Sequence, residues 1–507
     1  MKLQILRVVL AIISFSLLTF FFLDFAGLFP QQYFTLAKIQ FFPALLSGMF
    51  GIVAVLLALT LIFGRVYCSM ICPFGIFMDV VTWFRKRFQP KMKASYSKEK
   101  KWLRFGTLIV VVGSYSAGVT AVLSLLEPYS AYGRIVTHIF RPVYMAGNNL
   151  LASVFNQLGS YTFYHTNVFI HSITSLLIAL ATLSLVVILA ALYGRTWCNT
   201  VCPVGTIFGY LSKLSLFKVR INKNTCIGCG LCEKACKASC IDSQGKIIDQ
   251  SRCVACYNCL TSCKKGGISY CLPGKKQPLS KPVPVDESKR RFVGTLAATT
   301  LAIPATLVAQ NLNLPSSKTS YKKQYPLSPP GSCSSEHLLR HCTACHLCIA
   351  KCPSNVLKPA FLEYGLEGIM QPVMDFEHGF CNYDCTVCSE VCPTDALFKL
   401  TIEEKHTLQM GRVVFIKNNC VVFTDETSCG ACSEHCPTQA VEMVPYKDNL
   451  TIPSINPDIC VGCGGCEYIC PATPYKAIHV EGNPVHLEAK PYEETDNEEV
   501  VPDSFGF

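Results

Sequence analysis

Charged residues are scarce in this sequence, and acidic residues are especially scarce in its first part. Asp, Glu, Lys and Arg make up 16% of the 507 residues, whereas 50% are hydrophobic. Residues 1–311 contain 9 Asp and Glu against 32 Lys and Arg, and residues 312–507 contain 25 against 13. So little charge argues against an ordinary soluble enzyme and favours a protein that is partly embedded in a membrane.

The motifs of several large enzyme classes are also missing. The chain has no dinucleotide-binding fingerprint, no Walker motif and no Ser/His/Asp set. None of its 11 histidines forms the paired pattern of a haem site between two helices, and His171, alone on an apolar segment, is expected to be structural. The basic residues flank apolar segments, so membrane topology explains them and nucleic acid is not an expected partner.

Four apolar runs are long enough to cross a bilayer, whose core of about 30 Å needs roughly 20 helical residues. They cover about residues 5–29, 41–63, 103–126 and 168–193. A shorter and weaker run at 292–311 is a fifth candidate. The sequence thus predicts a membrane α-helical fold, with a four-span bundle and a fifth anchoring span.

The distribution of basic residues orients these spans. Residues 64–101 contain 9 Lys and Arg and residues 194–291 contain 17, whereas residues 127–167 contain only two. Positively charged connections stay in the cytoplasm, so residues 127–167 are predicted to lie outside. We therefore expect a multi-pass protein of the inner (cytoplasmic) membrane.

The stretch SKRRFVG at residues 288–294 precedes the fifth run and resembles a twin-arginine export signal. A solvated charge cluster at the start of a helix is the alternative. Cysteines that are assembled into metal sites before export would be protected from forming disulfides outside the cytoplasm. This favours a periplasmic location for the acidic C-terminal part.

Cysteine is abundant, with 31 residues, and it occurs in patterns typical of metal sites. GRVYCSMICPFG (residues 64–75) and GRTWCNTVCPVG (residues 194–205) each follow an apolar run. Two spans separate them, so both emerge on the same face of the membrane. One shared metal site is predicted, with an iron–sulfur cluster favoured, for Cys68, Cys72, Cys198 and Cys202. Two tight turns with buried thiols are the alternative.

Two further runs, CIGCGLCEKAC and CVACYNCLTSC, have the spacing of a two-cluster bacterial ferredoxin. In that arrangement the fourth cysteine of each run binds the cluster of the other run. The first cluster is then assigned to Cys226, Cys229, Cys232 and Cys263, and the second to Cys253, Cys256, Cys259 and Cys236. Zinc favours two CxxC pairs set further apart. Lys237 and Lys264 stand where a proline usually follows the fourth cysteine.

The C-terminal part repeats this theme four times, with a period of 39–40 residues. The tetrads are Cys342, Cys345, Cys348 and Cys352; Cys381, Cys385, Cys388 and Cys392; Cys420, Cys429, Cys432 and Cys436; and Cys460, Cys463, Cys466 and Cys470. Four more 4Fe–4S clusters are predicted, six in all, with a seventh metal site at the CxxxCP motifs. Several pairings of the fourth cysteines stay open, and Cys240, Cys271 and Cys333 receive no role.

These features define an expected domain order with α+β, bacterial ferredoxin-like dicluster domains. It consists of a membrane domain (1–215), a cytoplasmic dicluster ferredoxin (216–275), a linker with the signal and anchor span (276–313), an extracytoplasmic four-cluster domain (314–487) and an acidic tail (488–507).

The CxxxCP repeats and the adjacent dicluster resemble the NapH-type membrane polyferredoxins. The arginine pair, the weak apolar run and the four tetrads resemble the NapG- and MauM-type exported four-cluster ferredoxins. The chain looks like the two fused, as in a NapGH-like quinol dehydrogenase. The resemblance implies quinol in the bilayer as substrate and a redox partner protein outside the membrane.

The sequence therefore predicts an iron–sulfur protein that passes electrons from membrane quinol to an extracytoplasmic acceptor or reductase. Two alternatives stay open: a cytoplasmic ferredoxin as electron donor across the membrane, or a redox maturation factor for a metalloenzyme. Residues 127–167 contain eight Phe or Tyr residues, which favours the outer membrane interface. A quinol head-group site is predicted there, where His or Glu can accept a proton, at Glu127, Tyr132, Arg134, His138 and Arg141. Anchoring alone explains the aromatic residues equally well.

Overall fold

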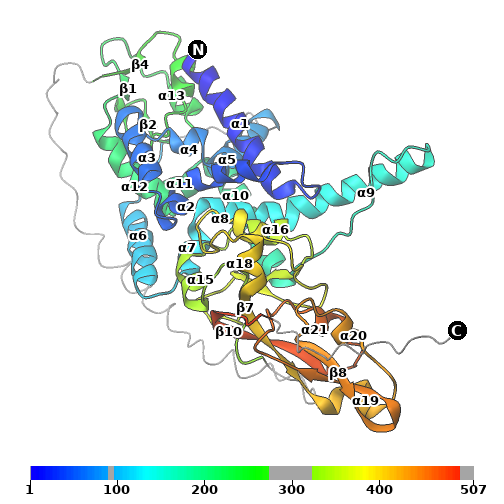
Figure 1. Cartoon of the computed structure of the whole chain (residues 1–507). Coiled ribbons are helices and arrows are strands. Elements are labelled where there is room, and N and C mark those ends of the chain that lie inside the picture. The colour runs from blue at the N-terminus through cyan, green and yellow to red at the C-terminus, as the bar shows by residue number, and fades with distance from the viewer. Residues whose placement is uncertain (1, 89–95, 273–322, 492–507) are drawn as a thin grey trace, which may run out of the picture. The chain divides into compact units, whose positions relative to one another are not determined.

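The computed structural model of the chain describes residues 2–88, 96–272 and 323–491 (Figure 1). The expected linker with its twin-arginine-like signal and fifth span, residues 276–313, lies outside the described residues. Most of the acidic tail lies outside them as well.

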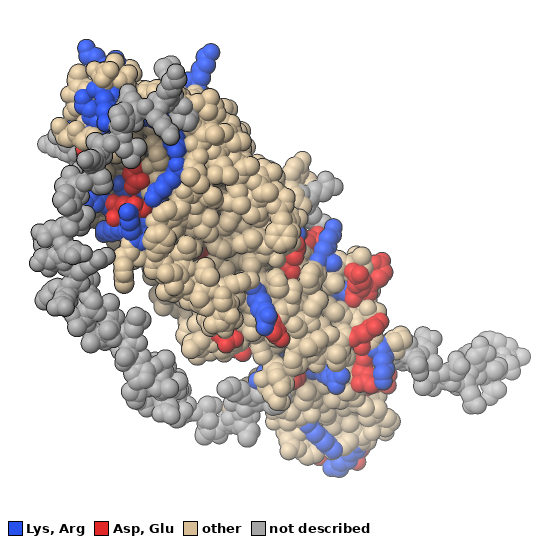
Figure 2. Space-filling model, turned by 90° about the vertical axis from the view of Figure 1, so that its left-hand side faces the viewer, with Lys and Arg blue, Asp and Glu red and all other residues tan. Residues whose placement is uncertain are grey.

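The first part of the chain is helical. Among the residues that the structure describes, two helices are long and apolar enough to cross a membrane, judged by length and composition: α1 (Lys2–Leu23) and α10 (Ile173–Tyr193). Many of their apolar side chains, such as Ile12 and Leu177, are exposed. Figure 2 shows a broad face of the molecule without charged side chains. Such a surface is unusual for a soluble protein and suits contact with lipid.

The other two predicted spans are broken. The run at 41–63 forms α2 (Phe41–Leu46) and α3 (Phe50–Phe63), and the run at 103–126 forms α6 (Lys101–Ser116) and α7 (Ala121–Leu126). Gly48 and Gly118 lie in the breaks with φ of 71° and 86°, the left-handed conformation that ends helices. The expected four-span bundle with a fifth span is therefore not confirmed in the described part of the chain.

Each CxxxCP repeat folds into a short helix, a turn and a second helix. In the first repeat these are α4 (Tyr67–Met70) and α5 (Pro73–Phe88), and in the second α11 (Thr196–Thr200) and α12 (Pro203–Leu211). The proline after the second cysteine begins the second helix, a position where its missing N–H costs nothing.

Residues 127–167, expected as a loop on the outer surface, are mostly helical. They form α8 (Pro128–Ile135), a π-helical turn (Val136–Phe140) and α9 (Arg141–Gln157). All eight residues of α8 are buried, so this segment belongs to the core.

The inner cysteine runs form a small α+β domain. Strand β1 (Lys218–Ile221) pairs antiparallel with β4 (Ile268–Cys271), and β2 (Ile241–Asp242) with β3 (Ile247–Ile248). Two short helices, α13 (Leu231–Ala235) and α14 (Asn258–Ser262), pack against each other. This is the ferredoxin-like arrangement that the spacing predicts.

The C-terminal part contains the same arrangement. Strand β7 (Leu408–Phe415) pairs antiparallel with β10 (Ile478–Glu488), and β8 (Val441–Pro445) with β9 (Thr451–Ile455). Between them lie α19 (Val421–Thr424), α20 (Ala431–Glu434) and α21 (Gly465–Ile469). The first two tetrads flank the pair β5 (Leu357–Pro359) and β6 (Pro372–Met374), with helices α15 (Ser335–His341), α16 (Leu347–Lys351), α17 (Val387–Glu390) and α18 (Ile402–Thr407).

Candidate iron–sulfur sites

The inner dicluster domain gathers its cysteines around two cavities. One is lined by Cys226, Cys229, Cys232 and Cys263, and the other by Cys253, Cys256, Cys259 and Cys236. In the loops, residues between the cysteines adopt left-handed backbone conformations, such as Gly228 with φ of 70° and Tyr257 with φ of 61°. Each cavity thus has three thiols from one run and one thiol from the other.

The last two C-terminal tetrads also exchange their fourth cysteines. Cys470 lines one cavity together with Cys420, Cys429 and Cys432. Burial, together with the nearby thiols of Cys460 and Cys436, raises the pKa of the Cys463 thiol to about 12. Cys436 therefore faces the loop of the last tetrad.

The first two C-terminal tetrads exchange cysteines in the same way. Burial raises the pKa of the Cys348 thiol well above its usual range, and the thiols of Cys345, Cys342 and Cys392 add to this. Burial likewise raises the pKa of Cys388, which has Cys381 and Cys352 beside it. The structure thus selects one of the pairings that the sequence left open.

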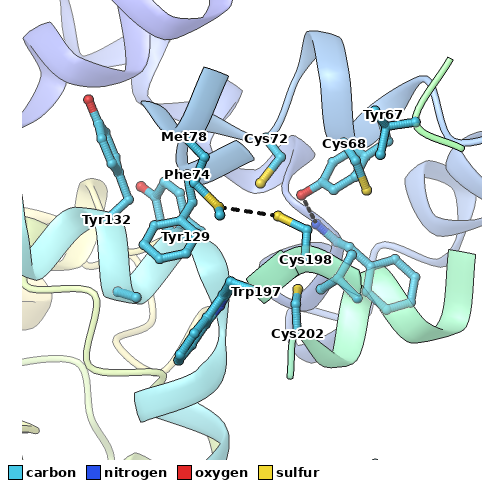
Figure 3. Packing of buried hydrophobic residues seen from close by; sticks show 14 of the residues in the cluster. Tyr67, Cys68, Cys72, Phe74, Met78, Tyr129, Tyr132, Trp197, Cys198 and Cys202 are labelled. Carbon is cyan, nitrogen blue, oxygen red and sulfur yellow. Dashed lines mark hydrogen bonds between the residues drawn. The ribbon is translucent and has the colours of Figure 1, made fainter. Parts of the chain in front are cut away.

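The four cysteines of the CxxxCP motifs, here called the quartet, lie near one another in the buried core (Figure 3). Burial raises the pKa of Cys202, and the neighbouring thiols of Cys198, Cys72 and Cys68 raise it further. Phe74, Trp197 and Met78 belong to the same buried cluster as these cysteines, and Cys198 Sγ lies 3.6 Å from Met78 Sδ. The structure therefore brings the two distant repeats together at their cysteines.

Two arginines hold the quartet by crossing between the repeats. Arg65 of the first repeat donates through Nη2 to the carbonyl oxygen of Cys198 (3.2 Å). Arg195 of the second repeat donates through Nη1 to the carbonyl oxygen of Cys68 (2.6 Å). Both guanidinium groups are fully buried. Each repeat therefore completes the cysteine turn of the other.

The last glycine of each motif leaves room for this crossing. A Cβ atom added at Gly75 would lie 2.5 Å from the carbonyl oxygen of Cys68, and one at Gly205 would collide with that of Cys198. Arginine nitrogens also lie next to both positions. The motif GRxxCxxxCPxG is thus explained position by position at its arginine, cysteines, proline and final glycine.

The quartet is attached to the inner dicluster domain. Asp79 forms ion pairs with Arg195 (2.7 Å), Lys237 (3.0 Å) and Arg7 (3.1 Å), all largely buried. Lys237 follows the cluster cysteine Cys236, and its carbonyl oxygen accepts a hydrogen bond from Arg195 N (2.9 Å). The lysine that replaces the usual proline therefore joins the two cysteine sites.

The segment that begins at Glu127 and continues into α8 lies near both the quartet and the first C-terminal cysteine loop. Glu127 is buried near Cys72, and Tyr129 is buried near both Cys345 and Cys392. Arg134 donates through Nη1 to the carbonyl oxygens of Ser124 (2.8 Å) and Ala344 (3.2 Å). Helix α8 thus packs directly on the loop of the first C-terminal tetrad.

The five residues predicted to bind quinol make separate contacts in the structure. Glu127 accepts a hydrogen bond from Ser130 N, and Tyr132 shares one with Thr19 (2.6 Å). The ring of His138 contacts that of His346, with Nε2 and Nδ1 2.7 Å apart. Burial, together with the nearby His171 and Arg134, lowers the pKa of His138 to about 3. Arg141 lines a cavity near the end of α1.

Three cysteines belong neither to a tetrad nor to the quartet. Cys240 Sγ lies 3.6 Å from Cys236 Sγ and lines the same cavity, a position that the sequence did not signal. Cys271 lies at the end of β4, near Ser269, and Cys333 is exposed. His171 is half-buried, its Nε2 has no hydrogen-bond partner, and its ring hydrogen bonds to the Asn355 side chain.

The chemistry of these thiol groups fits iron–sulfur clusters. Within residues 2–88, 96–272 and 323–491, no group of three or more His, Cys, Asp or Glu side chains is close enough to hold a single metal ion. A cubane is larger than one ion and needs its thiolates further apart. The buried thiols also require positive charge to ionise, which the cluster supplies, and Arg65 and Arg195 supply it at the quartet.

Two family models match parts of the chain. A 4Fe-4S binding domain matches residues 45–91 and 175–223, which contain all four quartet cysteines. A 4Fe-4S dicluster domain matches residues 427–473, which contain cysteines of the last two tetrads.

Several curated proteins are similar to the chain. It is 29% identical over 286 residues to the uncharacterized protein MJ0750 of Methanocaldococcus jannaschii, covering 54% of the chain and 99% of the relative. It is 27% identical over 157 residues to the ferredoxin-type protein NapF of Escherichia coli, covering 31% of the chain and 87% of the relative. It is 26% identical over 196 residues to the methylamine utilization ferredoxin-type protein MauN of Paracoccus denitrificans, covering 38% of the chain and 56% of the relative. No solved structure matches.

Proposed function

We propose that this iron–sulfur electron-transfer protein is bound to the membrane and passes electrons from membrane quinol to an acceptor outside. The ferredoxin-type domains and relatives support the electron-transfer function itself. The quinol, the acceptor, the direction and the topology are the proposed part. The fusion of a NapH-type with a NapG-type protein belongs to the same proposal.

One observation carries the proposal: the quartet lies between the inner dicluster and the C-terminal tetrads. Lys237 and Asp79 join it to the dicluster on one side. On the other side, Glu127 is near the quartet, and Tyr129 is near Cys345 of the first C-terminal tetrad. The seven thiolate sites then form one series for electron transfer. In this series the quartet takes the place of a haem group within the membrane part. The inner dicluster is the inner end of this series.

A second candidate is entry of electrons from a cytoplasmic ferredoxin. The cavity of the first inner cluster opens to the surface, because Cys229 is exposed and Ile227 is 70% exposed. Lys264 and Lys265 line the same cavity. A basic rim around an exposed cluster favours an acidic redox protein as partner.

Interrupting the series tests both candidates. The variant Cys72→Ser/Cys202→Ser lacks two quartet thiols, and Cys333→Ser is the matched control because Cys333 lies outside the sets. A reduced quinone analogue is added to anaerobic protein, and cluster reduction is followed by electron paramagnetic resonance. Signals of the inner dicluster are assigned with a Cys226→Ser/Cys253→Ser variant.

With quinol as donor, we expect the C-terminal clusters of the quartet variant to be reduced while the inner dicluster stays oxidised. Reduction of the inner dicluster alone, by reduced ferredoxin and not by quinol, would establish the second candidate. Complete reduction of both the inner dicluster and the C-terminal clusters in the quartet variant would show that electron transfer does not pass through the quartet. No reduction of wild-type clusters by quinol would refute the quinol function.

A further inference from the structure

A cavity of about 540 Å³ lies where the end of α1 meets α9 and the first two C-terminal cysteine loops. Its volume is within the range of sites for cofactors and small molecules. The apolar part of the wall is formed by Phe25, Phe29, Phe34, Met145, Tyr164 and Phe169. The polar part is formed by Asp24, Arg141, Lys351 and Asn355.

The apolar part is a frame of aromatic rings directly after the end of the apolar helix α1. The ring centroid of Phe25 lies 5.7 Å from that of Tyr144 and 6.2 Å from that of Tyr164. The ring of Phe34 packs on Phe21 of α1 at 4.9 Å. Such a frame accepts a flat apolar ring. Its position at the end of α1 suits a ligand that arrives from the membrane.

The polar part contains a buried ion pair and a buried arginine. Asp24 and Lys351 form a buried ion pair (2.6 Å), and the carboxylate also accepts hydrogen bonds from Leu28 N and Phe29 N. Arg141 is only 8% exposed, and its Nε has no hydrogen-bond partner. A buried polar group without a partner is costly, so the arginine favours a ligand with acceptor oxygens.

The cavity also borders a candidate cluster site. Cys352 lines it, and so do Val387 and Val391, which belong to or directly follow α17. Cys352 is the exchanged fourth cysteine that faces Cys381 and Cys388. A ligand in this cavity therefore lies against the protein shell of the second C-terminal cluster, the one assigned to Cys352, Cys381, Cys385 and Cys388.

We infer that this cavity is the quinone and quinol site, in which Arg141 donates a hydrogen bond to a ring oxygen. The inference rests on the proposed function and replaces the site predicted from the sequence, of which only Arg141 is kept. Oxidation of one quinol breaks two O–H bonds and releases two protons to water at the mouth of the cavity. Two oxidised clusters each take one electron, and the cluster at Cys352 takes the first.

Photolabelling with an azidoquinone tests binding independently of electron transfer. The probe is added to the full chain in phosphatidylcholine nanodiscs, and labelled peptides are identified by mass spectrometry. We expect labels in residues 24–34 and 141–169, and competition by unlabelled quinone. Met145→Trp fills the cavity, and Arg141→Gln removes the donor. Either variant should weaken labelling about tenfold or more, the loss expected for a charge-assisted hydrogen bond or a blocked site.

Arg340→Gln is the matched control, because Arg340 is an exposed arginine of the C-terminal part. Iron content shows whether each variant still assembles its clusters. Labelling elsewhere, or labelling that the two cavity variants leave unchanged, would overturn the site. Competition by phosphatidylglycerol but not by quinone would assign the cavity to an anionic lipid instead.

The two proposals fail separately in this experiment. If quinol reduces the clusters of Met145→Trp as fast as those of the wild type, the cavity is not the site although the proposed function stands. If the cavity is labelled but quinol reduces no cluster of the wild type, quinone binds there without serving as donor.

Discussion

The quartet and the ferredoxin-type tetrads both present four thiols, but they assemble them differently. A tetrad takes three thiols from one short loop whose left-handed residues, such as Ala344 and His346, turn the chain around the site. The quartet takes two thiols from each of two repeats that lie 130 residues apart, and buried arginines cross between them. A tetrad is therefore mostly a local structure, whereas the quartet depends on the packing of the whole first part.

The largest difference in stability between the quartet and a tetrad is expected when one crossing arginine is removed. Arg195→Met leaves the carbonyl of Cys68 without its donor and Asp79 without its shortest ion pair. Removal of one partner from a buried pair costs about 3–5 kcal/mol, so we expect a large fall in unfolding temperature and loss of the quartet centre. Thermal denaturation in detergent and iron analysis measure both.

Lys405→Met is the corresponding change at a tetrad. Lys405 is buried and donates to Cys381 Sγ (3.4 Å) and to the carbonyl oxygen of Asn382 (2.5 Å). We expect it to disturb only the cluster at Cys381. If Lys405→Met affected the quartet, or if Arg195→Met left it intact, the contrast between a local and a distributed site would be wrong.

The iron content of two double variants tests the exchange of fourth cysteines between the last two tetrads. Cys432→Ser/Cys470→Ser removes two ligands of one proposed cluster, so about four irons should be lost per chain. Cys466→Ser/Cys470→Ser removes ligands of two clusters, and about eight irons should be lost. Iron and sulfide analysis of the purified variants decides this, and the opposite result would mean that each tetrad binds its own cluster.

The close approach at the quartet predicts a steric effect. Gly205→Ala places a methyl group against the carbonyl oxygen of Cys198 and beside Arg65. Overpacking of this kind costs about 1–3 kcal/mol and should lower the unfolding temperature. Gly106→Ala in α6 is the control, since its added Cβ meets nothing within 4 Å. Equal effects of the two changes would argue against the crossing geometry.

The smallest effect is expected at the contact between the quartet and the inner dicluster. Lys237→Pro restores the usual ferredoxin residue and removes one of three cationic partners of Asp79. Because Arg195 and Arg7 remain, we expect a loss of about 1 kcal/mol or less. Thermal denaturation should show a small shift with all iron retained. A large loss of inner-cluster iron would show instead that Lys237 serves the cluster itself.

The cysteine spacing predicted the ligand loops, because three thiols in a row are a local property of the sequence. It did not predict the exchange between Cys352 and Cys392 or between Cys436 and Cys470, since strand pairing decides which loops meet. It also missed the burial of α8, because Tyr132 and Arg134 suit an interface loop as well as a core. The broken spans depend on Gly48 and Gly118, and a count of apolar residues overlooks two glycines.

The proposed quinone site depends on the sequence as well as on the structure. The sequence could name Arg141 as a candidate but could not separate it from Glu127 or His138, which are equally polar and close in the chain. Lys351 of α16 and Cys352, which directly follows that helix, line the same cavity as Arg141 although they lie more than 200 residues further along the chain. Such long-range contacts leave no periodic signal in the sequence.

The crossed arginines also impose an order on biogenesis. While the ribosome has produced only the first repeat, the turn at Cys68 lacks the donor that Arg195 supplies. The quartet thus becomes competent to receive iron only after the second repeat has emerged and docked. For the same reason, a substitution of the arginine in one repeat removes a hydrogen bond from the cysteine turn of the other repeat.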